Sequence, residues 1–172
     1  MGVGYRVRQF ARALGASIDR HNAIDLSQHL EAPQLELFHS MSRVDQYHSL
    51  AVLHALREAG VTELSLLQAA LVHDVGKTAG PVRIWHRVIA VLINALAPQL
   101  LERMDQQPGT WRYPFYVHRR HAILGAEMAH RAGCSSDVIW LIAHHEDRPR
   151  PIKGRQRKDE LLRALQVADE AN

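Results

Sequence analysis

The run of residues 64–72 constrains the fold most, because it is apolar on almost every side. A helix that is hydrophobic all round must lie in the middle of a protein and be covered by other elements. Other segments carry apolar residues at helical spacing, for example Val3, Val7, Phe10 and Leu14, and none keeps a period of two. We therefore expect an all-α fold, a single-domain helical bundle around a central buried helix.

Glycine, proline and short polar residues divide the rest of the chain into further helices and two loops. Gly60 and Gly133 each follow an apolar-faced run, and Gly76 is expected to end the central helix. Ser135 and Ser136 are suited to cap the helix that follows them. We expect helices over 24–30, 34–39, 45–59, 81–97, 98–104, 115–132, 138–145 and 159–171, with loops over 106–114 and 146–157.

The composition excludes several classes of protein. The 172 residues are 47% hydrophobic and 23% charged, which is typical of one globular domain. The single Cys134 excludes an internal disulfide. No apolar stretch approaches the roughly 20 residues of a membrane span, and the N-terminus lacks the apolar core of a signal peptide. We therefore expect a cytoplasmic protein that does not contact a membrane.

The net charge of +3 is too small for a protein that coats nucleic acid, so we expect no stable nucleic-acid binding. The sequence shows no dimer signature, although it is compatible with a homo-oligomer.

A His-Asp pair, His73-Asp74, stands at the C-terminal end of the central apolar run. Imidazole nitrogens and carboxylate oxygens are ligands for zinc, iron, manganese or cobalt, and a carboxylate can bridge two ions. Alternatively, the pair belongs to a capped helix end, with Gly76 in the left-handed conformation and Lys77 near the negative end of the helix dipole. The pair alone does not decide between these interpretations.

Other histidines and a late aspartate favour the metal-binding interpretation. Along the chain come His48, His-Asp-Val-Gly-Lys at 73–77, His121 in a His-x-x-x-Gly element, His144-His145-Glu146 and Ala168-Asp169. This order on an all-α chain resembles the HD superfamily of metal-dependent phosphohydrolases. The resemblance extends from Asp45 to the C-terminus. It implies an HD metal-binding domain over 41–172, preceded by an N-terminal helical extension over 1–40 that packs on the core.

The resemblance also implies a ligand set. The residues that match the metal ligands of the family, including the histidines of members with a dinuclear site, are His48, His73, Asp74, His121, His144, His145 and Asp169. The expected cofactor is therefore a pair of divalent ions bridged by Asp74. Ligands of this kind do not choose among Fe, Mn, Mg, Ni, Co and Zn.

Two divalent ions bridged by Asp74 can hold a shared water as hydroxide, which attacks phosphorus. Asp74 and Lys77 are thus the expected catalytic residues. Lys77 is also expected to bind a phosphate oxygen of the substrate. His118, one helical turn before His121, is a candidate proton donor to the leaving group.

The chain departs from the best-known bacterial relatives that carry the His-His-Glu element. Those relatives continue into Gly-Tyr-Pro and cleave cyclic di-GMP, whereas here a basic loop follows that includes Arg148 and Arg150. One interpretation is that this loop gathers phosphate at the mouth of the site, with Arg148 and Arg150 binding substrate. The other is a solvated loop without a functional role.

Three functions remain open at this stage. The leading one is a phosphohydrolase acting through a metal-bridged hydroxide on a small anionic substrate, a phosphate mono- or diester of nucleotide type. The second is a mixed-valent di-iron oxygenase of the HD type, which uses four His and two Asp ligands. The third is a non-catalytic HD signalling module.

The remaining histidines and the aromatic residues receive no role in the chemistry. We expect His21, His29, His39, His54, His86 and His130 at the surface or in helix packing. We expect Trp85, Trp111, Trp140, Tyr113, Phe115 and Tyr116 in the core or in the wall of a cavity.

Overall fold

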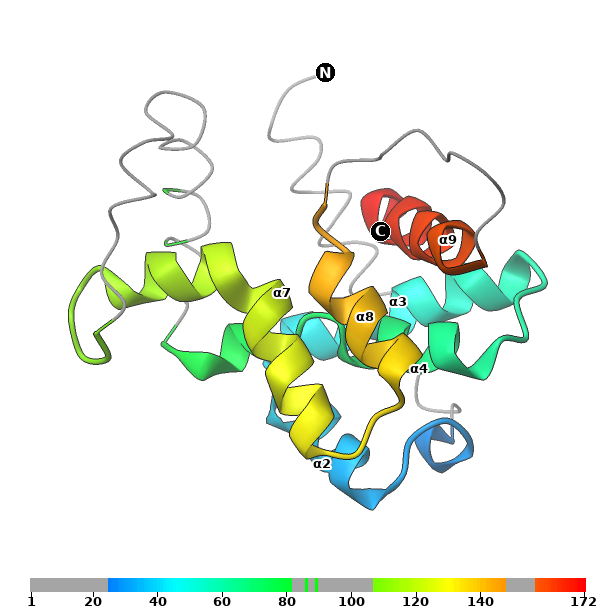
Figure 1. The fold of residues 1–172 in the computed structure, drawn as a ribbon, viewed down its shortest axis with the longest axis horizontal. Helices are drawn as coiled ribbons and strands as arrows, with labels where there is room; N and C mark the ends of the chain where they lie inside the picture. Colours follow the sequence, from blue (N-terminus) through cyan, green and yellow to red (C-terminus); the bar gives the residue numbers. More distant parts are fainter. Residues whose placement is uncertain (1–24, 82–85, 87–88, 90–106, 148–156) are drawn as a thin grey trace.

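The computed structural model describes residues 25–81, 86, 89, 107–147 and 157–172. This part of the chain contains α-helices and two short 3₁₀ helices but no strand, so the expected all-α fold is confirmed (Figure 1). The elements are η1 (Leu26–Gln28), α2 (Ala32–Ser40), α3 (Arg43–Glu58), α4 (Leu64–Val72), η2 (Val75–Ala79), α7 (Tyr113–Arg131), α8 (Ser136–His144) and α9 (Arg157–Ala171).

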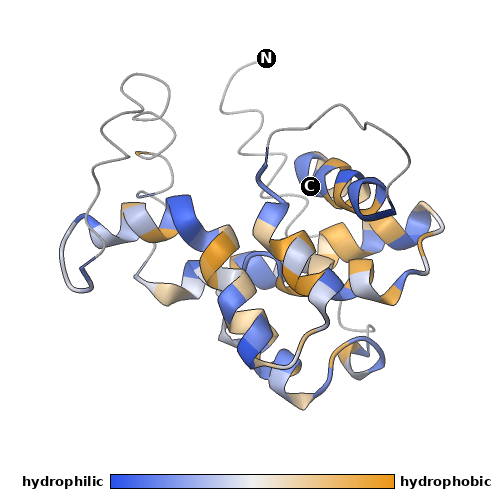
Figure 2. Cartoon of the chain, viewed as in Figure 1, coloured by the Kyte–Doolittle hydropathy of each residue, from blue (hydrophilic) through white to orange (hydrophobic). Residues whose placement is uncertain are grey.

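Helix α4 is the central element of the bundle. It contacts α2, α3, α8 and α9, and its residues Leu66, Ala69, Ala70, Leu71 and Val72 are fully buried. Helix α9 lies across α3 and α8 (Figure 1). Hydrophilic and hydrophobic residues are mixed on α7 and α9, as expected for helices with one buried face (Figure 2). The apolar character of 66–72 is therefore explained by the helices that cover it, whereas Leu64 at the start of the run is 50% exposed.

Local signals set most of the helix ends. The side chain of Ser42 accepts a hydrogen bond from the Asp45 amide at the start of α3, and Ser135 does the same for Val138 at the start of α8. Gly60 and Gly133 follow α3 and α7 with φ of +80° and +75°, in the left-handed region that favours glycine. These ends lie close to those expected from the sequence.

The expectation that Gly76 ends the central helix is wrong. Helix α4 stops at Val72, and His73 and Asp74 form a turn before η2, which contains Gly76. Gly76 is not in the left-handed conformation either. Asp74, with φ −92° and ψ 1°, occupies the sparsely populated bridge region in which many active-site residues lie. The helix thus ends before the His-Asp pair: His73 keeps helical backbone angles at the C-cap, and Asp74 departs from them.

Gly76 is needed because η2 and α7 approach each other closely. A Cβ atom on Gly76 would lie 2.0 Å from the carbonyl oxygen of His121 and 2.5 Å from the amide nitrogen of Gly125. No side chain fits against backbone at such distances. The two glycines therefore let the turn that carries Asp74 lie directly beside the helix that carries His121.

Several sequence predictions lie outside the described residues, wholly or in large part. They include the helices over 81–97 and 98–104, the first 24 residues, and Arg148 and Arg150. Leu30 and Phe38 belong to the same hydrophobic core as α4, and the division into an extension over 1–40 and a domain over 41–172 stays a prediction. Trp111 corrects one expectation, because its side chain is 70% exposed rather than in the core. Within the described segments, no helix has the length and apolar character needed to cross a membrane.

Candidate metal centre

Five elements bring histidine and aspartate side chains to one place at the centre of the bundle. His48 comes from α3, His73 and Asp74 from the turn after α4, and His121 from α7. The residue directly after α8, His145, and Asp169 on α9 complete the group. His73, Asp74, His121 and His145 are buried, whereas His48 and Asp169 are partly exposed.

One half of this centre lies between α3 and α9. Nε2 of His48 is 2.7 Å from Oδ1 of Asp169. Nε2 of His73 is 3.6 Å from the same oxygen and 3.7 Å from Oδ2 of Asp74. The ligand atoms of His48, His73 and Asp74 all lie within 4.8 Å of one another, close enough to hold one metal ion.

The other half uses the second oxygen of the same aspartate. Oδ1 of Asp74 is 3.3 Å from Nε2 of His121 and 4.0 Å from Nε2 of His145. These three side chains form a second group whose ligand atoms lie within 4.8 Å of one another. Asp74 therefore belongs to both groups and faces them with different oxygens.

The buried histidines are oriented in the same way. Nδ1 of His73, His121 and His145 donates a hydrogen bond to the backbone carbonyls of Ala70, His118 and Ile142, at 2.7–2.9 Å. In a neutral ring this leaves Nε2 unprotonated and directed into the centre, which is how metal-ligating histidines are commonly held. Nε2 of His73 is buried and makes no hydrogen bond. The residues present therefore fit a metal ion.

The comparison with family models agrees with this geometry. The model for the HD domain matches residues 46–171, most of the chain. This chain belongs to the HD-domain family. Members of this superfamily are mostly metal-dependent phosphohydrolases and bind divalent metals. Searches of the curated proteins and of the solved structures found no match.

The two carboxylates of the candidate metal centre, Asp74 and Asp169, are held in the charged form that binds cations. Burial alone would raise the pKa of the Asp74 carboxyl, but His73, His121 and Lys77 hold that pKa well below its usual range. Burial would also raise the pKa of the Asp169 carboxyl, but the hydrogen bond with His48 and the nearby ring of His73 keep that pKa far below its usual value. Both carboxylates are therefore anionic at neutral pH.

The pKa values of two buried histidines, His73 and His145, are shifted in opposite directions. Burial favours neutral His73, but the carboxylates of Asp74 and Asp169 outweigh it and raise the pKa of this ring. Burial, followed by repulsion from His73 and His121, lowers the pKa of His145 to about 3. His145 is thus neutral and able to bind a metal ion over the whole range in which proteins normally function.

Lys77, on η2, is directed back at the metal centre. Its Nζ donates to Oδ2 of Asp74, the oxygen that also faces His73. The ammonium group of Lys77 therefore lies beside the carboxylate shared by the two ligand groups.

The sequence alone did not assign a role to two residues of the HD domain. Gln166 is buried, and its Nε2 donates to the carbonyls of His145 and Asp147, at 3.1 and 2.8 Å. It lies three residues before Asp169 on the same face of α9, a spacing visible in the sequence. Glu146 was part of the motif, and its Oε1 lies 3.7 Å from Nε2 of His121.

His144 differs from the other predicted ligands. Like Asp169, it belongs to neither of the two three-residue groups found among the described residues, but Asp169 contacts His48 and His73. The ring of His144 is stacked on Trp140, with 4.5 Å between centroids, and its Nδ1 donates to the Trp140 carbonyl.

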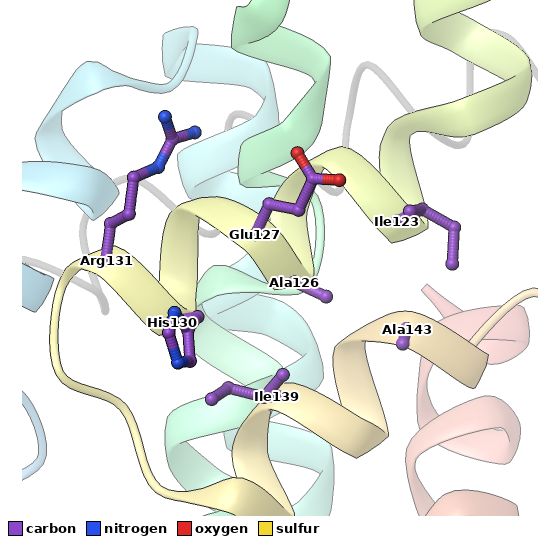
Figure 3. A pocket seen from close by; sticks show the side chains of 7 residues that line it. All are labelled: Ile123, Ala126, Glu127, His130, Arg131, Ile139 and Ala143. Carbon is purple, nitrogen blue, oxygen red and sulfur yellow. The ribbon is translucent and has the colours of Figure 1, made fainter.

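An open hollow of about 510 Å³ lies between α7 and α8, apart from this centre (Figure 3). Ile123, Ala126 and Ile139 form part of its apolar lining, and Glu127, His130 and Arg131 also line it. No predicted metal ligand lines it, so its position does not suggest a role in metal chemistry.

Proposed function

We propose that this HD-domain protein is a metal-dependent phosphohydrolase that acts on a phosphate mono- or diester, a small anionic substrate of nucleotide type. The observation that carries the proposal is the position of Asp74. Its carboxylate is buried and anionic, and its two oxygens face two separate groups of histidines. This is the arrangement that a carboxylate bridging two metal ions requires.

The proposed cofactor is a pair of divalent ions drawn from Fe, Mn, Mg, Ni, Co and Zn. His48, His73, Asp74 and Asp169 would hold one, and Asp74, His121 and His145 would hold the other. Bound ions of this kind supply a water molecule with a lowered pKa and stabilise negative charge on phosphate oxygens. The protein itself keeps the histidine rings in the ligating tautomer through their Nδ1 hydrogen bonds and keeps both carboxylates ionised.

Lys77 is the proposed substrate-binding and catalytic residue beside Asp74. Its ammonium group is mostly buried and lies next to the carboxylate, so it needs another anionic partner whenever cations occupy the oxygens of Asp74. A substrate phosphate oxygen meets that need. Arg148 and Arg150 are proposed to attract the same anionic substrate, and their positions lie outside the described residues.

The direct test is a screen of phosphate monoesters, diesters and nucleotides with the purified protein and Mn²⁺, Fe²⁺ or Mg²⁺. We expect metal-dependent phosphate release or diester cleavage that is lost in Asp74→Asn, a variant of nearly identical shape. Metal bound in full with no substrate cleaved would contradict the proposal and favour the oxygenase. A protein that binds no metal would favour the non-catalytic signalling module.

One observation favours the oxygenase as the second candidate function. The side chains that converge include four histidines and two aspartates, which are His48, His73, Asp74, His121, His145 and Asp169. This is the ligand count of the mixed-valent di-iron enzymes with an HD fold. Oxygen consumption by the iron-loaded protein, in the presence of candidate substrates, distinguishes this function from hydrolysis.

A further inference from the structure

The second group of ligands contains only three side chains, and the sequence pattern assigned its next ligand to His144. The ring of His144 is instead held against the preceding turn of its own helix. It stacks on Trp140 and its Nδ1 donates to the Trp140 carbonyl, 2.8 Å away. Trp140 also contacts Lys158 on α9, whose Nζ lies over the indole ring, 5.8 Å from its centroid. The rings of His144 and Trp140 and the ammonium group of Lys158 therefore pack together where α8 meets α9.

Glu146, two residues later, is directed toward the second group instead. Its Oε1 lies 3.7 Å from Nε2 of His121. Two ligand atoms bound about 2.1 Å from the same tetrahedral ion are about 3.4 Å apart. The separation of Glu146 from His121 is therefore similar to that of Asp74 from His121, which is 3.3 Å. The two carboxylates approach the same imidazole nitrogen.

The backbone on both sides of Glu146 is fixed. The side-chain amide of Gln166 donates to the carbonyls of His145 and Asp147, the two neighbours of Glu146. The Asp147 amide donates to the carbonyl of His144, 2.9 Å away. The turn after α8 thus holds Glu146 next to the second group, while its half-exposed side chain keeps the freedom to adjust.

Charge gives a second reason for a carboxylate at this position. Two divalent ions bring four positive charges into a buried site, and Asp74 and Asp169 offset two of them. Another imidazole adds no negative charge, whereas Glu146 offsets one more. Buried charges are costly unless they are paired, so a carboxylate stabilises a second ion more than His144 would.

We propose that Glu146, and not His144, completes the second metal site together with Asp74, His121 and His145. This inference rests on the proposed two-ion site. It assigns the glutamate of the His-His-Glu element a direct role as a metal ligand and leaves His144 a role in packing.

The test measures binding of Mn²⁺ alone to the full-length protein, by calorimetric titration and by electron paramagnetic resonance. Three variants are compared with the wild type: Glu146→Gln, His144→Gln and Glu127→Gln. Glu127 is an exposed carboxylate on α7 that lines the outer hollow, so its variant controls for the loss of one negative charge. Circular dichroism and thermal unfolding establish that each variant is folded.

We expect Glu146→Gln to weaken the second Mn²⁺ by at least about tenfold and to replace the spectrum of a coupled ion pair with that of a single ion. His144→Gln and Glu127→Gln should keep both ions and the coupled spectrum. The proposal is overturned if Glu146→Gln binds the second ion as the wild type does, or if His144→Gln loses it. A wild type that binds no second Mn²⁺ overturns both this proposal and the two-ion site. A wild type that binds two ions, with Glu146→Gln doing the same, overturns this proposal alone.

Discussion

Nε2 of His48 lies 2.7 Å from Oδ1 of Asp169, although the two residues are 121 positions apart in the sequence. This contact joins α3 to α9 and brings the last helix of the described chain to the His-Asp turn after α4. Residues so distant meet only in the folded protein. Asp169 therefore joins the candidate metal centre only when α9 is docked on the bundle.

The first prediction concerns this contact. Asp169→Asn keeps the shape of the side chain and removes the charge that faces His48 and His73. We expect it to weaken the ion held by His48, His73 and Asp74 by at least about tenfold. Metal content after dialysis is the measurement. Glu170→Gln, an exposed neighbour on the same helix, is the control and should retain the metal of the wild type.

The second prediction concerns the close approach of η2 and α7. Gly76→Ala puts a Cβ atom 2.0 Å from the His121 carbonyl oxygen, so the two elements must separate. We expect the free energy of unfolding to fall by about 3 kcal/mol. Denaturant titration measures it. Gly60→Ala, where nothing lies within 4 Å and only the positive φ is strained, should cost about 1 kcal/mol. Equal losses at the two positions would contradict this account of Gly76.

The third prediction concerns Lys77, which donates to Asp74. Lys77→Gln removes the positive charge proposed to bind the substrate phosphate but removes no metal ligand. We expect kcat/KM for a phosphate ester to fall by about 10²-fold with the number of bound ions unchanged. Kinetics and metal analysis on one preparation supply both quantities. Loss of metal in this variant would show instead that Lys77 is needed for metal binding, and would contradict its proposed role in binding substrate.

The fourth prediction concerns the acid stability of the protein after treatment with a chelator. The pKa of His145 falls to about 3 on folding, so the stability it contributes is complete above pH 6.5 and is lost as the pH drops toward 3. The raised pKa of His73 has the opposite sign and favours the folded state on the acid side. Lowered pKa values at Asp74 and Asp169 remove stability only below about pH 4.

Between pH 6.5 and 4 we therefore expect the free energy of unfolding to decrease, and His145→Gln to remove most of that decrease. Urea titrations at a series of pH values measure it. A variant with the same slope as the wild type would show that His145 is protonated as readily in the folded protein as in the unfolded chain.

The sequence predicted the fold well because the fold follows from local patterns. The apolar run of 64–72 requires a covered helix, and Gly60, Gly133 and Ser135 mark helix ends through backbone and capping preferences that depend on few neighbours. The order of histidines and aspartates then indicated the HD family, which the match over 46–171 confirms.

Features that depend on contacts between elements could not be predicted in the same way. Gly76 looked like a helix terminator. Glycine is needed there because the backbone of α7 leaves no room for a Cβ atom, and no local sequence pattern contains that contact. Adjacent residues such as His144 and His145 looked equivalent, but only His145 faces Asp74, because the ring of His144 is stacked on Trp140. Trp111 was expected in the core or in a cavity wall but is exposed. It lies in a turn, and the hydrophobicity of a turn residue does not by itself show whether its side chain is buried.

The most direct test of the central claim is a metal count on the wild type and on Asp74→Asn, combined with phosphate release from the best substrate found. Because Asp74 faces both groups of histidines, the account predicts two ions per chain and metal-dependent hydrolysis for the wild type. It predicts loss of both ions and of hydrolysis for the folded variant. An Asp74→Asn protein that keeps its ions, or that hydrolyses the substrate at the wild-type rate, would contradict the account.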